Sequence, residues 1–145
     1  MNVYRIVLAD DHVLLRQGLK KIIEEKADIE VVGEAGDGLE LLNLLNKLTL
    51  SKLTPNMVIL DISMPNLSGI EATRQIKTIY PDVKVLILSM HRNSEYVYHS
   101  ISAGAQGYLL KEDASVDLFS AIEKIRQGGV YISPLLASEL ASGLF

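Results

Sequence analysis

The sequence predicts an α/β fold, a doubly wound parallel sheet of five strands with five helices on its two faces. Short apolar runs alternate along the chain with segments of helical periodicity, and the connections between them are short, as in α/β folds. Continuous apolar runs of this length are typical of strands buried on both faces of a parallel sheet. The expected strands are residues 4–9, 29–35, 57–60, 84–88 and 107–110.

After each expected strand, apolar residues recur every three or four positions, as they do on the buried face of a helix. The first such segment has Leu15, Leu19 and Ile22 at this spacing, with charged residues between them. Pro81 ends the third segment, because proline does not continue a helix. Helices are therefore expected near residues 15–23, 39–48, 70–79, 95–103 and 118–125.

Two regions depart from this alternation. Residues 46–56 are long for a connection between a helix and a strand, and we expect a surface insertion or an extra helical turn there. Residues 131–145 continue past the fifth unit, with Leu136 and Leu140 at helical spacing. We therefore expect one domain over residues 1–130, followed by a tail that forms either a short docked helix or the start of a linker.

Composition and charge exclude several classes of protein. The chain has 145 residues, a formal net charge of −4 and no cysteine, which excludes disulfides and thiolate metal sites. No apolar run approaches the ~20 residues that span a bilayer, and the N-terminus lacks a signal-peptide pattern. We expect a cytoplasmic protein without membrane contact. The mild acidity argues against a domain whose main task is to hold DNA phosphates.

Polar residues that can carry chemistry follow four of the expected strands. Asp10 and Asp11 end the first strand, Asp61 the third and Ser89 the fourth, and the fifth strand runs into Lys111. At the carboxyl ends of parallel strands these residues would share the crevice where such sheets bind ligands. Neighbouring carboxylates repel one another unless a cation lies among them, and oxygen ligands suit Mg²⁺. The sequence therefore predicts a magnesium site beside a hydroxyl and an ammonium group.

Four motifs carry a resemblance to a known family. They are Ala9-Asp-Asp-His12, Leu60-Asp-Ile-Ser-Met-Pro65 with Ser68-Gly69, Leu88-Ser89 and Gly107-Tyr-Leu-Leu-Lys111. Over residues 3–130 the chain resembles the receiver domain of two-component response regulators. The closing Gly128-Gly-Val-Tyr-Ile-Ser-Pro134 is similar to receivers of the NarL/FixJ (LuxR-type) class, in which a helix-turn-helix DNA-binding domain follows. The resemblance implies a flavodoxin-like, CheY-like fold with strand order 2-1-3-4-5.

The resemblance also implies a chemical role for each acidic residue. Asp61 would be the phosphoacceptor, forming 4-aspartylphosphate with a phosphoryl group from a sensor histidine kinase. Asp11 and Asp61 would ligate Mg²⁺ through carboxylate oxygens, and Ser63 would add its backbone carbonyl. Asp10 would act mainly through a bound water, and Lys111 would pair with a phosphoryl oxygen.

A conformational switch is implied as well. Ser89 would donate a hydrogen bond to the phosphoryl group, and its movement would let the Tyr108 ring rotate from an exposed to a buried position. This rotation would remodel the surface of the fourth helix, fifth strand and fifth helix. Candidates for contact with a partner on that surface are Tyr96, Tyr98 and Ile101.

The implied function is a signalling module and not an enzyme. Phosphorylation would control a DNA-binding output domain that regulates transcription and is absent from this chain. The expected partners are a sensor histidine kinase and, on phosphorylation, a second copy in a homodimer, with DNA contacted only through the output domain. A stand-alone receiver that acts through protein–protein contacts is an alternative.

Two further alternatives belong to other classes. A Mg²⁺-dependent phosphatase that forms an aspartyl phosphate typically has a second acid two residues after the nucleophile, where this chain has Ser63. A flavin- or nucleotide-binding protein of the same fold would need a phosphate-cradling loop after the first strand, where Asp10 and Asp11 would repel a phosphate.

The three histidines lie in separate segments without the spacing of metal ligands. His12, His91 and His99 are therefore expected at the surface or beside the ligands. In the resembling family, two positions near the site tune hydrolysis of the phosphorylated state. Here Ser63 and His91 hold these positions and are candidates for that effect.

Overall fold

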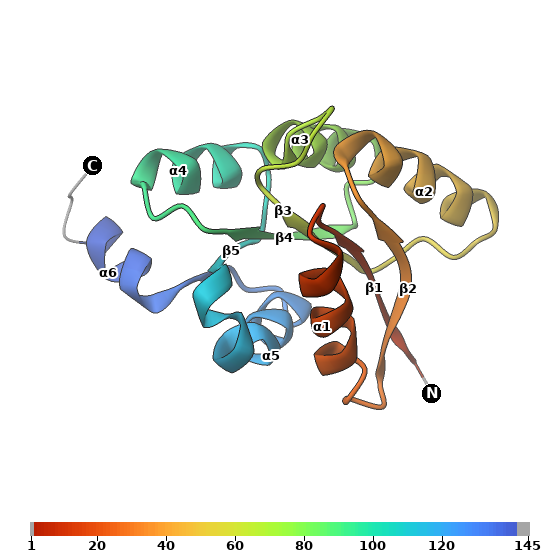
Figure 1. The fold of residues 1–145 in the computed structure, drawn as a ribbon, viewed down its shortest axis with the longest axis horizontal. Coiled ribbons are helices and arrows are strands. Elements are labelled where there is room, and N and C mark those ends of the chain that lie inside the picture. Colours follow the sequence, from red (N-terminus) through yellow and green to blue (C-terminus); the bar gives the residue numbers. More distant parts are fainter. Residues whose placement is uncertain (1, 142–145) are drawn as a thin grey trace.

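In the computed structural model, which describes residues 2–141, six parallel strands form one sheet in the order β2-β1-β3-β4-β5-β6 (Figure 1). The strands are β1 (Tyr4–Ala9), β2 (Ile29–Ala35), β3 (Met57–Asp61), β4 (Lys84–Ser89), β5 (Gly107–Leu110) and β6 (Tyr131–Ile132). The predicted fold class and the order of the first five strands are confirmed. The predicted number of strands was wrong by one, because β6 adds a short parallel pairing to the edge of β5.

Helices cover both faces of the sheet (Figure 1). One face carries α1 (Val13–Ile23) and α5 (Ala114–Arg126), and the other carries α2 (Gly38–Leu50), α3 (Gly69–Ile79) and α4 (Ser94–Ser102). A 3₁₀ turn, η1 (Lys111–Asp113), joins β5 to α5, and α6 (Pro134–Ala141) follows β6. The described residues thus hold one α-helix more than the five that the sequence predicts.

Alternation along the strands produces two apolar cores, because successive side chains of a strand point to opposite faces. In β1, Ile6 and Leu8 pack toward α1 and α5, whereas Val7 packs toward α2, α3 and α4. All three are at most 1% exposed. Burial on both faces explains why the strands read as continuous apolar runs.

The long connection after the second predicted helix is partly helix and partly loop. Asn46 lies inside α2, which continues to Leu50 and leaves only residues 51–56 as a loop. The Thr54 hydroxyl donates to the Thr49 hydroxyl at 3.1 Å and ties this loop to the end of the helix. The helix thus extends two residues past its predicted end at residue 48, and the rest of the connection is a loop.

The segment after α5 packs on the sheet and forms a docked helix, one of the two expected forms of the tail. Leu136 is 2% exposed and lies in the same core as Tyr108 and Leu110 of β5. The predicted division into residues 1–130 and a tail that leads to an output domain stays a prediction, and its residues 142–145 lie outside the described part. Within residues 2–141 we find no helix with the length and apolarity needed to cross a membrane.

Candidate functional site

The carboxyl edge of the sheet gathers two carboxylates around one ammonium group. Lys111 Nζ lies 3.1 Å from Asp10 Oδ2 and 3.2 Å from Asp61 Oδ2. Asp10 follows β1, Asp61 ends β3 and Lys111 follows β5. Because parallel strands end at the same edge, three segments far apart in the chain meet here. The structure therefore brings together these three residues that the sequence placed at strand ends.

Asp61 sits at the centre of this group and is almost completely buried. Burial raises the pKa of its carboxyl above the ordinary value; the charge of Lys111 opposes this effect and that of Asp10 adds to it. The backbone N–H of Ser63 donates to Asp61 Oδ1 at 3.3 Å. One carboxylate oxygen thus faces the loop after β3, and the other faces the ammonium group of Lys111.

The amino end of α3 packs directly against the backbone of Asp61. A Cβ atom on Gly69 would lie 2.3 Å from the Asp61 carbonyl oxygen and 2.8 Å from the Ile62 Cα. Such distances are far shorter than van der Waals contact, so only glycine permits this approach. Ser68 begins the helix by accepting the Glu71 N–H. Gly69 therefore shapes the loop after β3 and also sets the position of the last residue of that strand.

Asp10 is hydrogen-bonded through only one of its two carboxylate oxygens. Its Oδ1 accepts the His12 backbone N–H at 2.8 Å, and His12 Nδ1 lies 3.0 Å from the same oxygen. Its Oδ2 is buried and makes no hydrogen bond, although it forms the ion pair with Lys111. Asp11 is more open, with 38% of its side chain exposed. The acidic pair thus has one buried and one accessible carboxylate.

This donor set fits a hard divalent cation. Ligand atoms of Asp10, Asp11, His12 and Asp61 lie within 4.8 Å of one another. Carboxylate oxygens are the ligands that Mg²⁺ favours, and the buried Asp10 oxygen without a hydrogen bond is the kind of group that a cation or its water satisfies. Three of the predicted ligands are therefore close together. The role of the Ser63 carbonyl stays a prediction.

Ser89 and Tyr108 meet at the loop after β4. The Ser89 hydroxyl is buried and accepts the His91 N–H at 2.9 Å, and the Tyr108 hydroxyl donates to the His91 carbonyl at 2.7 Å. Burial raises the pKa of Tyr108, whose ring is fully covered. The structure shows the buried position of this ring and not an exposed one, so the predicted exchange between two positions stays a prediction.

His91 lies beside Ser63, the other residue expected to tune hydrolysis of the phosphorylated state. Its Nε2 lies 3.3 Å from the Ser63 hydroxyl, and its ring stacks on Tyr96 with centroids 4.2 Å apart. His99 lies on α4 and lines a different, open cavity. Two of the three histidines, His12 and His91, thus lie beside the carboxylates. Both lie close to site residues in the sequence, whereas the atoms that they contact depend on loop geometry.

Arg16 was missed by the sequence reasoning. Its guanidinium donates to the backbone carbonyls of Asp10 and Ala35 and forms an ion pair with Glu34 at 3.0 Å. These contacts tie the carboxyl ends of β1 and β2 together. In the sequence, Arg16 is one of several charged residues between the apolar positions of a helix, so nothing singles it out.

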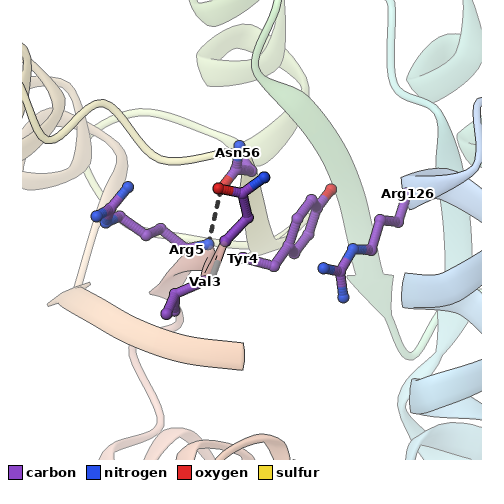
Figure 2. A pocket seen from close by; sticks show the side chains of 6 residues that line it. Val3, Tyr4, Arg5, Asn56 and Arg126 are labelled. Atoms are coloured by element: carbon purple, nitrogen blue, oxygen red, sulfur yellow. Dashed lines mark hydrogen bonds between the residues drawn. The ribbon is translucent and has the colours of Figure 1, made fainter. Parts of the chain in front are cut away.

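Cavity size does not identify the site. The cavity beside the carboxylates has a volume of about 200 Å³ and is lined by His12, Asp61, Ser63, Met90, His91 and Lys111. A cavity of about 340 Å³ lies at the beginning of β1, where Tyr4 stands between Asn56 and Arg126 (Figure 2). The Arg126 guanidinium there is already paired with Asp28 and Glu123. We assign the site by its chemistry, which favours the smaller cavity.

Comparison with known proteins shows which family the chain matches. Residues 6–123 match the family described as the response regulator receiver domain. The transcriptional regulatory protein DegU of Brevibacillus brevis is 42% identical over 139 residues, which cover 96% of this chain and 57% of that protein. The chain therefore spans little more than half the length of this curated relative.

Solved structures give the same fold. A two-component response regulator of the LuxR family from Aurantimonas sp. SI85-9A1 superposes with a TM-score of 0.89 at 36% identity, covering 98% of each chain. The isolated receiver domain of RcsB from Salmonella enterica serovar Typhimurium, solved in the presence of the phosphomimetic BeF₃⁻, has a TM-score of 0.83 at 28% identity. That alignment covers 94% of this chain and 98% of the RcsB chain.

Proposed function

Because the chain belongs to the response regulator receiver domain family, we propose that Asp61 accepts a phosphoryl group from a sensor histidine kinase in a Mg²⁺-dependent reaction. The observation that carries this proposal is the placement of Asp61. It is a nearly buried carboxylate at the end of β3, within 3.2 Å of Lys111 and beside two further acids. A carboxylate in this setting can attack phosphorus while neighbouring positive charge offsets the charge that accumulates on the phosphoryl oxygens.

Each residue of the site has its own role in the transfer of the phosphoryl group. An Asp61 oxygen forms the new bond to phosphorus while the bond between phosphorus and the kinase imidazole breaks, and the imidazole nitrogen keeps the electron pair. Asp11 and Asp61 would hold Mg²⁺ through carboxylate oxygens, with the Ser63 carbonyl as a further ligand, and Asp10 would act mainly through a bound water. When bound, the metal would supply positive charge that offsets the negative charge of the carboxylate and the phosphoryl oxygens. Lys111, which is paired with Asp10 and Asp61 before the transfer, would pair with one phosphoryl oxygen after it.

Ser89 and Tyr108 transmit the phosphorylation of Asp61 to the surface of the domain. On phosphorylation, the Ser89 hydroxyl turns from the His91 N–H to donate to a phosphoryl oxygen. Because His91 also accepts from the Tyr108 hydroxyl, the loop after β4 carries this movement to the Tyr108 ring. The change shifts the population between two existing positions of the ring and remodels the surface near Tyr96.

The chain acts in the cytoplasm as the regulatory part of a transcription regulator. The relatives are longer than this chain, and the DegU protein is named a transcriptional regulatory protein. A DNA-binding output domain beyond this chain would therefore read the state of the receiver, and the phosphorylated receiver would form a homodimer. A receiver that acts alone through protein–protein contacts is the second candidate. Turnover of external phosphate esters is disfavoured, because Ser63 stands where such enzymes typically have an acid.

The assignment of Asp61 can be tested directly. With Mg²⁺ and acetyl phosphate, the wild-type protein should gain one phosphoryl group that peptide mass spectrometry maps to Asp61. Asp61→Asn should lose it, whereas Asp82→Asn, a change of an exposed aspartate outside the site, should keep it. Beryllofluoride should bind to wild type only when Mg²⁺ is present. Full labelling of Asp61→Asn at another residue would contradict the assignment.

A further inference from the structure

The hydrogen bonds between β5 and β6 continue for one residue beyond the end of β6. The Tyr131 N–H donates to the Gln106 carbonyl and the Ser133 N–H to the Tyr108 carbonyl, each at 3.0 Å. The next group of β5 that faces β6 is the Leu110 N–H. It donates to the Ser133 side-chain hydroxyl at 2.9 Å. A side chain thus replaces the backbone acceptor that the two-residue strand does not provide.

Ser133 is completely buried, so these contacts are shielded from water. Its backbone carbonyl accepts the Ala137 N–H in the first turn of α6. One residue therefore joins β5 to α6 through its side chain, its N–H and its carbonyl. A buried N–H that loses its acceptor carries the full cost of its desolvation, so the Leu110 amide depends on this hydroxyl.

The position of Leu110 gives this hydrogen bond a consequence for the site. Leu110 directly precedes Lys111, whose ammonium group lies 3.1 Å from Asp10 and 3.2 Å from Asp61. A backbone shift at Leu110 moves the Cα from which Lys111 extends. The Ser133 N–H also holds the carbonyl of Tyr108, the other residue of this strand to which the proposed function gives a role.

We propose that Ser133 is a positioning residue that sets where Lys111 meets the phosphoryl group and couples this contact to the docking of α6. The inference rests on the proposed function of Asp61. When the site is occupied, Lys111 is held by the phosphoryl group, and the Leu110–Ser133 hydrogen bond is held with it. Coupling free energies are reciprocal. Binding of a phosphoryl group or its mimic at the site therefore stabilises the docked position of α6, and loss of the Ser133 hydroxyl weakens that binding.

If the role of Ser133 were purely structural, loss of its hydroxyl would change beryllofluoride binding no more than loss of another buried serine hydroxyl. Ser100 supplies this matched control. Ser100 is also a completely buried serine, and its hydroxyl donates to the Tyr96 carbonyl within α4. Ser100→Ala removes a buried hydroxyl and no contact to β5. Ser133→Ala removes the acceptor of the Leu110 N–H, whereas Ser133→Thr keeps an oxygen at the same place.

The experiment measures beryllofluoride binding by NMR in the presence of Mg²⁺, using the 145-residue chain and its variants. We expect Ser133→Ala to bind about fivefold more weakly than wild type, the lower end of ordinary coupling between sites. Ser133→Thr and Ser100→Ala should stay near wild type. Hydrogen exchange supplies a second measurement on the wild-type protein alone: the Leu110 and Ala137 amides should exchange more slowly when beryllofluoride is bound.

Equal beryllofluoride affinities for Ser133→Ala, Ser100→Ala and wild type would overturn the inference. If Ser133→Ala does not fold, unchanged exchange at Leu110 and Ala137 in the wild-type protein would overturn it in the same way. Failure of the wild-type protein to bind beryllofluoride at all would instead contradict the proposed function of Asp61, which separates the two conclusions.

Discussion

Replacing Lys111 by methionine should destabilise the protein strongly when no metal is present. Methionine keeps most of the aliphatic chain and removes the charge that lies 3.1 and 3.2 Å from two carboxylates. At an effective dielectric constant of about 20, each contact is worth about 5 kcal/mol before desolvation. Desolvation of the three groups offsets much of this. We expect a net loss of about 3–5 kcal/mol, as for removal of one partner from a buried ion pair.

Urea denaturation with and without Mg²⁺ measures this effect. Lys20→Met is the control, because Lys20 pairs with Glu34 at 3.8 Å and the two side chains are 42% and 29% exposed, and such solvent-accessible pairs contribute only about 0–1 kcal/mol. Mg²⁺ should stabilise Lys111→Met more than wild type, because in the variant the cation does not compete with an ammonium group for the carboxylates.

The loss of stability in Lys111→Met should also depend on pH, and the direction of this dependence follows from the pKa of the Asp61 carboxyl. Burial already raises the pKa of Asp61, and the variant lacks the Lys111 charge that opposes this effect. A carboxyl group whose pKa is higher in the folded than in the unfolded state binds its proton more tightly when the protein is folded. Its contribution to stability is therefore present at pH values below the unfolded-state pKa and is lost as pH rises through the folded-state pKa. The loss in Lys111→Met should therefore be larger at pH 8 than near pH 5. A small, pH-independent loss equal to that of Lys20→Met would refute the reasoning.

Two further predictions concern the packing of glycines and the ionisation of Tyr4. Gly69→Ala should lower the free energy of unfolding by about 1–3 kcal/mol and slow labelling of Asp61, because the new Cβ meets backbone atoms at 2.3–2.8 Å. Gly18→Ala, at an exposed position of α1 where a Cβ would have no atom within 4 Å, should raise the free energy of unfolding by about 0.5–1 kcal/mol. Thermal melts that place both variants on the same side of wild type would contradict this pair of predictions. Burial raises the pKa of Tyr4 to about 12, so the unfolded chain ionises first and stability falls between pH 10 and 12. This fall should be smaller in Tyr4→Phe, and identical alkaline titrations of both proteins by circular dichroism would exclude it.

The first five strands and the placement of Asp61 and Lys111 could be predicted from the sequence because both follow from local patterns. A strand buried on both faces has a continuous apolar run, and the first polar residue after the run marks its carboxyl end. Parallel topology then brings these ends to one edge without any knowledge of side-chain contacts. The sixth strand carries no such pattern, because Tyr131 and Ile132 form only a single two-residue pairing.

The sequence by itself determined which residue types stand at the ends of the strands, and therefore the acidic site that holds Asp10 and Asp61. Only the tertiary structure decided which further groups reach that site. His12 meets Asp10 through the turn after β1, and Arg16 reaches the same residue from α1. Ser133 meets Leu110 across 23 positions of the chain. Apolar periodicity is a local property of the chain, whereas a hydrogen bond between distant segments depends on how loops and helices pack, to within a few tenths of an ångström.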